Sequence, residues 1–382
     1  MKSFEFNLQT RFVIGVGAVE RLGELVRAYG GERALLISDP GLAAAGHVER
    51  AAATIRRAGA ECFVFLGVEE NPTTRHVDRA VAAGREHGID LLVGLGGGSA
   101  MDTAKGANFI LSCGGRMQDY AGVGKATGPM LPMIAVPTTA GTGSEAQSFA
   151  LIADEATHMK MACGDKRAAC RAAVLDPALT LSQPREVAAL TGIDAASHAL
   201  ESYVTTRRNP LSQLFSREAW RLIARSYPRI FEAPEDLEAR GGMLWGAALA
   251  GLAIEHSMLG ATHSCANPLT ARFGLAHGRA IGIMLPHVIR ANAGAVAGLY
   301  LELLTEIHRN GASAATAGEV LAALVEELQA VGELPRTLSE CGVERRALPE
   351  LAGQAAAQWT AQFNPRPLDE ADFLGLYERA WG

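Results

Sequence analysis

The 382-residue sequence lacks the features that mark several classes of protein. Its six cysteines are scattered without CxxC spacing, which argues against a disulfide framework and against a zinc finger. It has no apolar run long enough for a transmembrane helix, and its first residues have no apolar core of a signal peptide. Its net charge of −6 leaves no basic footprint for nucleic acid or for an anionic membrane. We therefore expect a reduced, cytoplasmic protein with no nucleic-acid or membrane partner.

The pattern of apolar residues predicts two domains, because a chain of this length is too long for one compact core. In the first half, short apolar runs alternate with helical stretches, which predicts an α/β domain built on a parallel sheet with helices on both faces. The expected strands cover residues 4–14, 34–37, 61–68, 90–99 and 130–139, and the expected helices cover residues 19–29, 47–58 and 77–87.

From about residue 183 the pattern becomes helical, with long amphipathic segments and few β-branched runs. The expected helices there cover residues 186–205, 210–231, 237–259, 314–331 and 370–381. We therefore assign residues 1–182 to an α/β domain and residues 183–382 to an all-α domain.

A carboxylate and an imidazole stand one helical turn apart in the stretch TGIDAASHALE. Asp194 and His198 are spaced i, i+4, so on a helix both side chains project from one face, about 5–6 Å apart at Cβ. Such a pair suits a metal, but on its own it is more often a plain hydrogen-bonded pair at the surface.

Two more histidines, His263 and His277, would lie about 21 Å apart on one straight helix. Both can reach one metal only if the chain bends between them, and Pro268, Gly274 and Gly278 permit a bend. One carboxylate with three imidazoles makes a mixed oxygen and nitrogen ligand set that suits Fe²⁺ or Zn²⁺.

Glycine-rich loops follow two of the expected strands. The run Gly96–Ser99 lies between an apolar strand and a helix, where backbone N–H groups and a helix N-terminus can hold a pyrophosphate. It matches neither GxGxxG nor GxxxxGK[ST], and a tight structural turn is the alternative. A second polar loop, Thr138–Ser144, follows the next strand, and two such loops at neighbouring strand ends line one crevice.

Asp39, at the end of an early strand, has the chemistry to accept hydrogen bonds from an adenosine ribose and to repel the extra phosphate of NADP. A turn-forming aspartate before Pro40 is nearly as good an interpretation.

The motifs GGGSAMDTAKG, PTTAGTGSE and GIDAASHALE, together with His263 and His277, resemble the iron-containing (group III) alcohol dehydrogenases over nearly the whole chain. The resemblance implies metal binding by Asp194, His198, His263 and His277. It implies NAD(P) contacts from ten positions: Asp39, Asn71, Gly97, Gly98, Ser99, Asp102, Thr138, Thr139, Thr142 and Lys160. It further implies that the domain of residues 1–182 binds NAD(P) and that the domain of residues 183–382 binds metal and substrate. A substrate cleft between the domains and a homodimer or larger homo-oligomer are also implied.

Three positions depart from the family's usual pattern. Many members carry a histidine where this chain has Asn267, a substrate-facing position by the same resemblance, and an asparagine cannot act as an acid or a base. His256 stands where asparagine is common; on a helix continuous with His263 it would lie about 10 Å away along the axis. We interpret it as a polar residue of the helix wall. Gln147 replaces a threonine.

The activity implied is hydride transfer between a nicotinamide cofactor, NAD or NADP, and a small alcohol or aldehyde, with the metal as Lewis acid. The alternative is a metal- and NAD-dependent lyase resembling dehydroquinate synthase. Its anionic substrate needs a cluster of cations, and the two metal-ligand stretches offer only Arg272 and Arg279. A non-catalytic protein that kept the fold is disfavoured, because all four ligands are present. Neither the particular alcohol nor the choice between Fe²⁺ and Zn²⁺ follows from the sequence.

Overall fold

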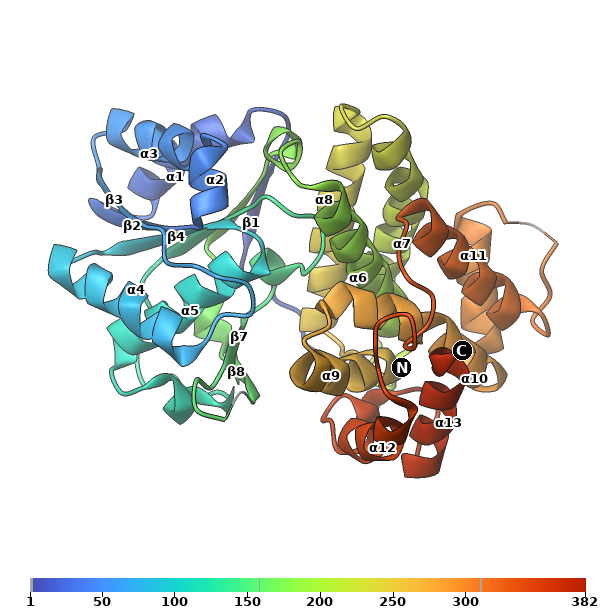
Figure 1. The fold of residues 1–382 in the computed structure, drawn as a ribbon. Coiled ribbons are helices and arrows are strands. Elements are labelled where there is room, and N and C mark those ends of the chain that lie inside the picture. Colours follow the sequence, from blue (N-terminus) through green and yellow to red (C-terminus); the bar gives the residue numbers. More distant parts are fainter. Residues whose placement is uncertain (1–2, 158, 310) are drawn as a thin grey trace. The chain divides into compact units, whose positions relative to one another are not determined.

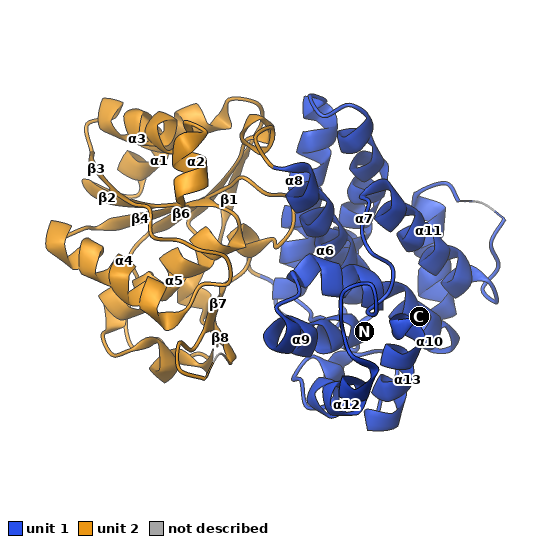
Figure 2. Cartoon of the chain, in the orientation of Figure 1, with its two compact units in different colours: residues 1–6, 184–382 blue, residues 7–183 orange. Residues whose placement is uncertain are grey.

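The computed structural model describes residues 3–157, 159–309 and 311–382, which form two compact units (Figure 2). The unit that comes first along the chain, drawn in orange in Figure 2, spans Asn7–Gln183 and contains the sheets, and the second, drawn in blue, contains Pro184–Gly382. Residues 3–6 belong to the second unit, where the Phe6 ring lies against the ring of His256, with 4.6 Å between the ring centroids. Only Arg11–Ile14 of the expected first strand is a strand, because it alone pairs with a neighbour in the sheet.

The first unit is built on a six-stranded parallel sheet with the order β1–β9–β6–β4–β2–β3. The strands are β1 (Arg11–Ile14), β2 (Arg33–Ile37), β3 (Glu61–Phe65), β4 (Leu91–Gly96), β6 (Met133–Pro137) and β9 (Ala172–Leu175). The central strands β4 and β6 are buried along their whole length, which explains why their sequences, LLVGLG and MIAVP, are continuous apolar runs.

Helices cover both faces of this sheet, as predicted (Figure 1). They are α1 (Leu22–Ala28), α2 (Pro40–Ala44), α3 (His47–Arg57), α4 (Thr74–His87) and α5 (Gly98–Cys113). On the side of α1 and α3, Leu25 and Ile55 pack with Leu36 and Val93 of the sheet in one buried core. The β–α alternation read from the sequence is therefore the true connectivity from β2 to α5.

A second, three-stranded sheet was not predicted. It joins β5 (Gly122–Val123), β7 (Phe149–Ala153) and β8 (Lys160–Gly164), and its β7–β8 pair is antiparallel. These strands carry no clear polar–apolar alternation, and β5 has only two residues. The inner strand β9 was also missed, since its parallel partners β1 and β6 are distant in sequence and give no local signal.

In the described part of residues 184–382 every regular element is helical, as predicted. The α-helices are α6 (Arg185–Val204), α7 (Pro210–Glu232), α8 (Leu237–Glu255), α9 (Ala261–Phe273), α10 (His277–Glu306), α11 (Ala317–Val331), α12 (Leu348–Ala356) and α13 (Glu370–Trp381). Sequence signals set several starts: Asn209 caps α7 ahead of Pro210, and Asp236 caps α8. The helices α9, α10 and α12 were not predicted as such.

The bend between His263 and His277 lies at Gly274, which ends α9 in the left-handed conformation with φ of 64°. The bend was predicted, but Pro268 and Gly278 do not make it. Pro268 lies inside α9. Gly278 lies inside α10, where an added Cβ would come within 2.2 Å of the Leu190 carbonyl oxygen, so this glycine lets α10 pack closely on α6.

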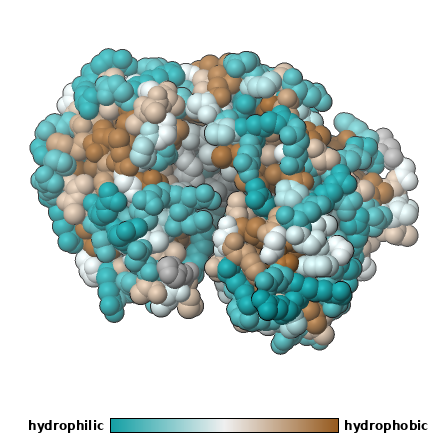
Figure 3. Space-filling model, in the orientation of Figure 1, coloured by the Kyte–Doolittle hydropathy of each residue, from teal (hydrophilic) through white to brown (hydrophobic). Residues whose placement is uncertain are grey.

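By length and mean composition, helix α10 is the one described helix that could cross a membrane, although its sequence has no uninterrupted apolar run of that length. Its most apolar window is 61% buried within the described structure, as in the core helix of a globular unit. On the face drawn in Figure 3, hydrophobic residues form separate patches interrupted by hydrophilic ones. The apolar character of α10 is therefore explained by its place in the helical core.

The close packing at Gly278 predicts a large difference between two glycine substitutions in the same helix. Gly278→Ala would force α10 away from the Leu190 carbonyl, and we expect it to destabilise the protein by about 1–3 kcal/mol. Gly294→Ala is the matched control: its Cβ would meet none of the described atoms within 4 Å, so it should be neutral or stabilising by up to about 1 kcal/mol. Urea unfolding measures both. Equal stability of the two variants would show that Gly278 has no packing role.

Candidate metal and cofactor sites

Helices α6, α9 and α10 bring one carboxylate and three imidazoles together. Asp194 and His198 project from one face of α6, His263 lies in the first turn of α9, and His277 is the first residue of α10. The Asp194 Oδ1 atom lies 3.5 Å from His198 Nε2, 3.6 Å from His263 Nε2 and 3.8 Å from His277 Nε2. The structure therefore gathers all four side chains that the sequence marked, from three helices.

These distances are too long for good hydrogen bonds. Among the described residues, neither Asp194 Oδ1 nor His263 Nε2 has a hydrogen-bonding partner, although both atoms are buried. Ligand atoms of Asp194, His263 and His277 all lie within 4.8 Å of one another. Buried polar atoms without partners are costly, and one cation among them would satisfy them together. The donor set fits a divalent transition metal.

Electrostatics in this cluster favours a charged carboxylate. Burial by itself would raise the pKa of Asp194, but His198, His263 and His277 together hold the pKa well below its usual range. Burial would lower the pKa of His263, but Glu201 and Asp194 raise it to about 9. The site therefore combines a firmly ionised carboxylate with surroundings that stabilise added positive charge.

Glu201 is a member of this cluster that the sequence analysis missed. Its Oε2 lies 2.5 Å from His263 Nδ1, and its Oε1 accepts a 2.7 Å hydrogen bond from the backbone N–H of Thr262. The carboxylate is buried. The sequence does indicate Glu201 as a member of the cluster, since Asp194, His198 and Glu201 follow the spacing i, i+4, i+7 of one helix face.

Two of the three positions that depart from the family pattern, Asn267 and His256, lie in different surroundings. Asn267 is half-buried on α9, where its Nδ2 donates a 3.1 Å hydrogen bond to Gln358 Oε1. His256 follows the last residue of α8, and residues 257–260 separate His256 from the start of α9. The expected continuous helix through His256 and His263 is therefore wrong. The Phe6 ring contact supports the interpretation of His256 as part of the helix wall.

In the first unit, the carboxyl ends of the neighbouring strands β2, β4 and β6 bring the marked loops together. The backbone N–H of Thr138 donates to the Gly96 carbonyl, and Gly97 stands before the first turn of α5. A Cβ on Gly97 would lie 3.4 Å from Thr139 Oγ1, and a Cβ on Gly98 would lie 2.8 Å from Thr142 Cγ2. Gly98 is therefore needed for the close approach of the two loops.

Asp39 lies at the same edge and is also a helix cap, since its Oδ1 accepts the Leu42 N–H at 3.0 Å. Its Oδ2 would lie 3.7 Å from a Cβ built on Gly96. The capping role and the cofactor role proposed from the sequence use different oxygens and are compatible. Ser99, in the first turn of α5, accepts a hydrogen bond from Thr103 through its backbone carbonyl.

The remaining three marked residues lie in different surroundings. Asn71 adopts a positive φ of 53° in the turn before α4, and Lys160 is exposed at the start of β8. Asp102 is buried and accepts hydrogen bonds from Ser144 Oγ at 2.7 Å and from the Leu151 N–H at 3.2 Å. Burial raises the pKa of Asp102, while nearby Lys105 opposes the shift. Asp102 thus connects α5 to the second glycine loop and to β7.

Lys105 and Glu145 are buried charged groups that the sequence analysis did not mark. Lys105 Nζ donates to the Ser144 carbonyl, to Ser144 Oγ and to the Phe149 carbonyl at 2.6–2.9 Å. Burial raises the pKa of Glu145 to about 7. Gln147 donates through Nε2 to the Thr142 carbonyl, which further orders the loop. Lys105 was detectable, because DTAKG places it one helical turn after Asp102.

Comparison with known proteins agrees with this geometry. The family model for iron-containing alcohol dehydrogenases matches residues 9–177, and the model for the C-terminal part of the Fe-containing alcohol dehydrogenase family matches residues 188–381. The NAD-dependent methanol dehydrogenase of Bacillus methanolicus is 33% identical over 370 residues, 96% of this chain and 97% of the relative. The 1,3-propanediol dehydrogenase of Klebsiella pneumoniae is 32% identical over 384 residues, 100% of this chain and 99% of the relative.

Comparison with solved structures agrees with the sequence comparison. A 1,3-propanediol oxidoreductase superposes with a TM-score of 0.96 at 31% identity, covering 100% of both chains. An alcohol dehydrogenase from Oenococcus oeni has a TM-score of 0.96 at 29% identity, covering 99% of this chain and 100% of the other. The chain therefore belongs to the iron-containing alcohol dehydrogenase family.

Within that family the chain is an NAD(P)-dependent alcohol dehydrogenase, an oxidoreductase that acts on a CH–OH group. The lyase alternative is not favoured. The two arginines that it would use for an anionic substrate are already paired, Arg272 with Glu350 and Arg279 with Glu186.

The two phosphate-loop glycines give a prediction with an internal control. In Gly98→Ala, the new methyl would displace Thr142, whose Oγ1 accepts the Ser144 N–H, at a cost of about 1–3 kcal/mol. We expect a lower melting temperature and NADH binding weaker by about tenfold or more. Gly97→Ala makes only an ordinary contact and should keep the natural melting temperature.

Thermal unfolding and NADH fluorescence titration measure both effects. The double variant Gly98→Ala/Thr142→Ala relieves the closest contacts and should recover part of the lost affinity. Natural NADH affinity in Gly98→Ala would disprove the role of this close approach.

Proposed function

We propose that Asp194, His198, His263 and His277 bind one Fe²⁺ ion, and that the protein oxidises small alcohols and reduces the matching aldehydes with NAD(H). The observation that carries this proposal is the buried Asp194 Oδ1 with an imidazole Nε2 on three sides at 3.5–3.8 Å. A shared cation accounts for an arrangement that hydrogen bonding does not.

When bound, the ion supplies Lewis acidity that favours deprotonation of an alcohol. The chain's own residues supply the rest. The helices hold the ligands in fixed positions, and the burial of Asp194, His198 and His263 limits competition by water. The ligand types also fit Zn²⁺, and the family's name favours iron.

For the cofactor, the glycine-rich edge of the sheet offers backbone N–H groups at the start of α5, where a pyrophosphate binds well. Asp39 Oδ2, which is not the capping oxygen, is suited to accept from an adenosine ribose, so we infer a preference for NAD over NADP. We assign Asn71 and Lys160 to more distant parts of the cofactor, on the family resemblance.

The substrate proposal rests on α9 and on the names of the relatives, which include methanol, 1,3-propanediol and choline dehydrogenases. Asn267 can orient a substrate oxygen by hydrogen bonding but cannot take its proton. Its partner Gln358 lines a hollow of about 500 Å³, whose other lining residues include Trp359, three alanines, two prolines and Leu368. This lining contains none of the four metal-ligand candidates, so the substrate proposal rests on Asn267 and on the relatives.

The assembly proposed is a homodimer or larger homo-oligomer. β1 is an edge strand of the large sheet, and Ile14 and the nearby Val16 are 49% and 62% exposed. An uncovered apolar edge favours pairing with another copy. We also assign the protein to the cytoplasm: all six cysteines lie in the described residues as free thiols, as a reducing compartment maintains them.

Removal of one imidazole tests the metal site. In His277→Ala, we expect the metal content of anaerobically purified protein to fall severalfold and alcohol oxidation to be lost, while NADH affinity stays within about twofold. The reason is that the metal loses a ligand whereas the cofactor loops belong to the other unit.

Elemental analysis, turnover of an alcohol panel and NADH titration measure these outcomes. His256→Asn is the matched control, since His256 packs on Phe6 and lies outside the cluster. Natural metal content and turnover in His277→Ala would contradict the proposed ligand set.

Cofactor choice tests Asp39. Asp39→Asn keeps an oxygen that can cap α2 but removes the charge. Since two charges 4 Å apart interact by about 1 kcal/mol even in water, the ratio of kcat/KM for NAD over NADP should fall by about fivefold or more. Asp39→Ser, also a good cap, should give the same shift. An unchanged ratio in both variants, or a natural preference for NADP, would refute the role given to Asp39.

A further inference from the structure

Glu201 connects a metal-ligand candidate to the start of a helix. It lies seven residues after Asp194 on α6, and its two carboxylate oxygens face different groups of α9. Oε2 meets His263 Nδ1 at 2.5 Å, and Oε1 accepts the Thr262 N–H at 2.7 Å. One buried side chain therefore holds both the backbone and the imidazole of the same helical turn.

The first turn of α9 is capped from outside. Its N-cap residue is Gly260, which has no side chain to accept the first N–H groups. Asn364 Oδ1 accepts the Ala261 N–H at 3.3 Å, and Glu201 accepts the next one, from Thr262. A Cβ on Gly260 would lie 3.1–3.2 Å from these two acceptors, so the glycine allows them to approach. The negative charge of Glu201 also suits a helix N-terminus.

The contact with Glu201 decides how the His263 ring presents its nitrogens. A carboxylate can only accept, so His263 Nδ1 must carry a proton and donate it. Its Nε2 then lies toward Asp194 Oδ1, at 3.6 Å, where it can offer a lone pair to a cation. Ring orientation and tautomer are fixed by the same bond.

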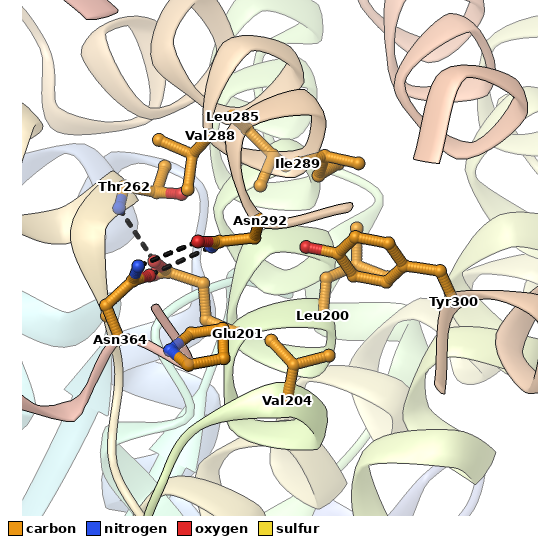
Figure 4. A pocket seen from close by; sticks show the side chains of 12 residues that line it. Leu200, Glu201, Val204, Thr262, Leu285, Val288, Ile289, Asn292, Tyr300 and Asn364 are labelled. Carbon is orange, nitrogen blue, oxygen red and sulfur yellow. Dashed lines mark hydrogen bonds between the residues drawn. The ribbon is translucent and has the colours of Figure 1, made fainter. Parts of the chain in front are cut away.

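The surroundings of Glu201 hold it in this position. Behind it, Asn292 and Asn364 exchange two amide hydrogen bonds of 2.9 and 2.7 Å (Figure 4). The same side chains, with Thr262 and Tyr300, line a cavity of about 10 Å³, which is just enough for one water molecule. Thr262 Oγ1 is buried there without a hydrogen-bonding partner among the described residues. A shortened Glu201 would open into this cavity and admit water, so an isosteric change is the cleaner probe.

We propose that Glu201 is a positioning residue for the metal site, which orients His263 and keeps its Nε2 available to the metal while it caps α9. This inference rests on the metal site of the proposed function. Glu201 takes no part in binding substrate or cofactor; it acts through His263.

The test is Glu201→Gln, which keeps size and shape. Its amide cannot accept from both the Thr262 N–H and His263 Nδ1, so the imidazole loses its fixed orientation. We expect the dissociation constant for Co²⁺ or Zn²⁺, measured by competition with a chromophoric chelator, to rise by about 10- to 100-fold. Because the change removes a buried charge, the apoprotein should stay folded with a melting temperature near the natural one.

Three further measurements separate positioning from a plain structural role. Asn364→Ala removes the other cap of α9 without touching His263, so it should lower the melting temperature and leave the metal dissociation constant within about threefold. In the natural zinc-loaded protein, NMR with ¹⁵N-labelled histidine should show a solvent-protected His263 Nδ1 proton far downfield. Glu201→Asp, which keeps the charge but shortens the reach, should bind metal at least about fivefold more weakly.

The outcomes are distinct. Natural metal affinity in Glu201→Gln, or in Glu201→Asp if the first variant does not fold, would overturn the inference and leave the metal site standing. Equal loss of metal affinity in Asn364→Ala would also overturn it, because helix capping would then be the whole effect. A natural protein that binds no metal with stoichiometric occupancy would refute the proposed function itself.

Discussion

The packing of the helical unit depends on one buried carboxylate, whose negative charge must be compensated. Asp194 is 5% exposed, and an isolated charge at such a depth is very unfavourable. Its compensation comes from three imidazoles on α6, α9 and α10, which must therefore converge within a few ångströms. The backbone is adapted to this convergence, with a left-handed Gly274 between α9 and α10 and with Gly278 packed against the Leu190 carbonyl. The geometry of the cluster and the packing of the helices are two aspects of one constraint.

A second set of polar groups surrounds the four candidate metal ligands. Glu201 satisfies the outer nitrogen of His263 and the N-terminus of α9, and Asn364 supports the same turn. In contrast to the Nδ1 of His263, which meets Glu201, the atoms Asp194 Oδ1 and His263 Nε2 lack partners among the described residues. A cluster whose histidine is held from outside while its inner atoms lack protein partners is organised to receive an ion.

The sheet unit meets a different constraint. Parallel strands end at one edge, so the loops after β2, β4 and β6 are brought together by topology alone. Their close approach is permitted at Gly98 and held by buried bonds from Asp102 and Lys105 to Ser144. Lys105 shows that a lysine in a glycine-rich motif can serve loop order, since its three acceptors are all protein oxygens. The rigidity of this edge rests on buried polar bonds as much as on apolar packing.

Local sequence determined the elements whose signals are local. The apolar runs of β4 and β6, the Asn cap of α7 and the Asp cap of α8, and the i, i+4 spacing of Asp194 and His198 could all be recognised without the fold. The meeting of His263 and His277 with this pair, the pairing of β1 with β9, the end of α8 before His256 and the contact of Glu201 with His263 were decided by the tertiary structure. Each of these features brings together residues that are distant in sequence, or separates residues at a turn between helices. Which of them meet depends on loop closure and on close packing across elements, and neither leaves a periodic trace in the sequence.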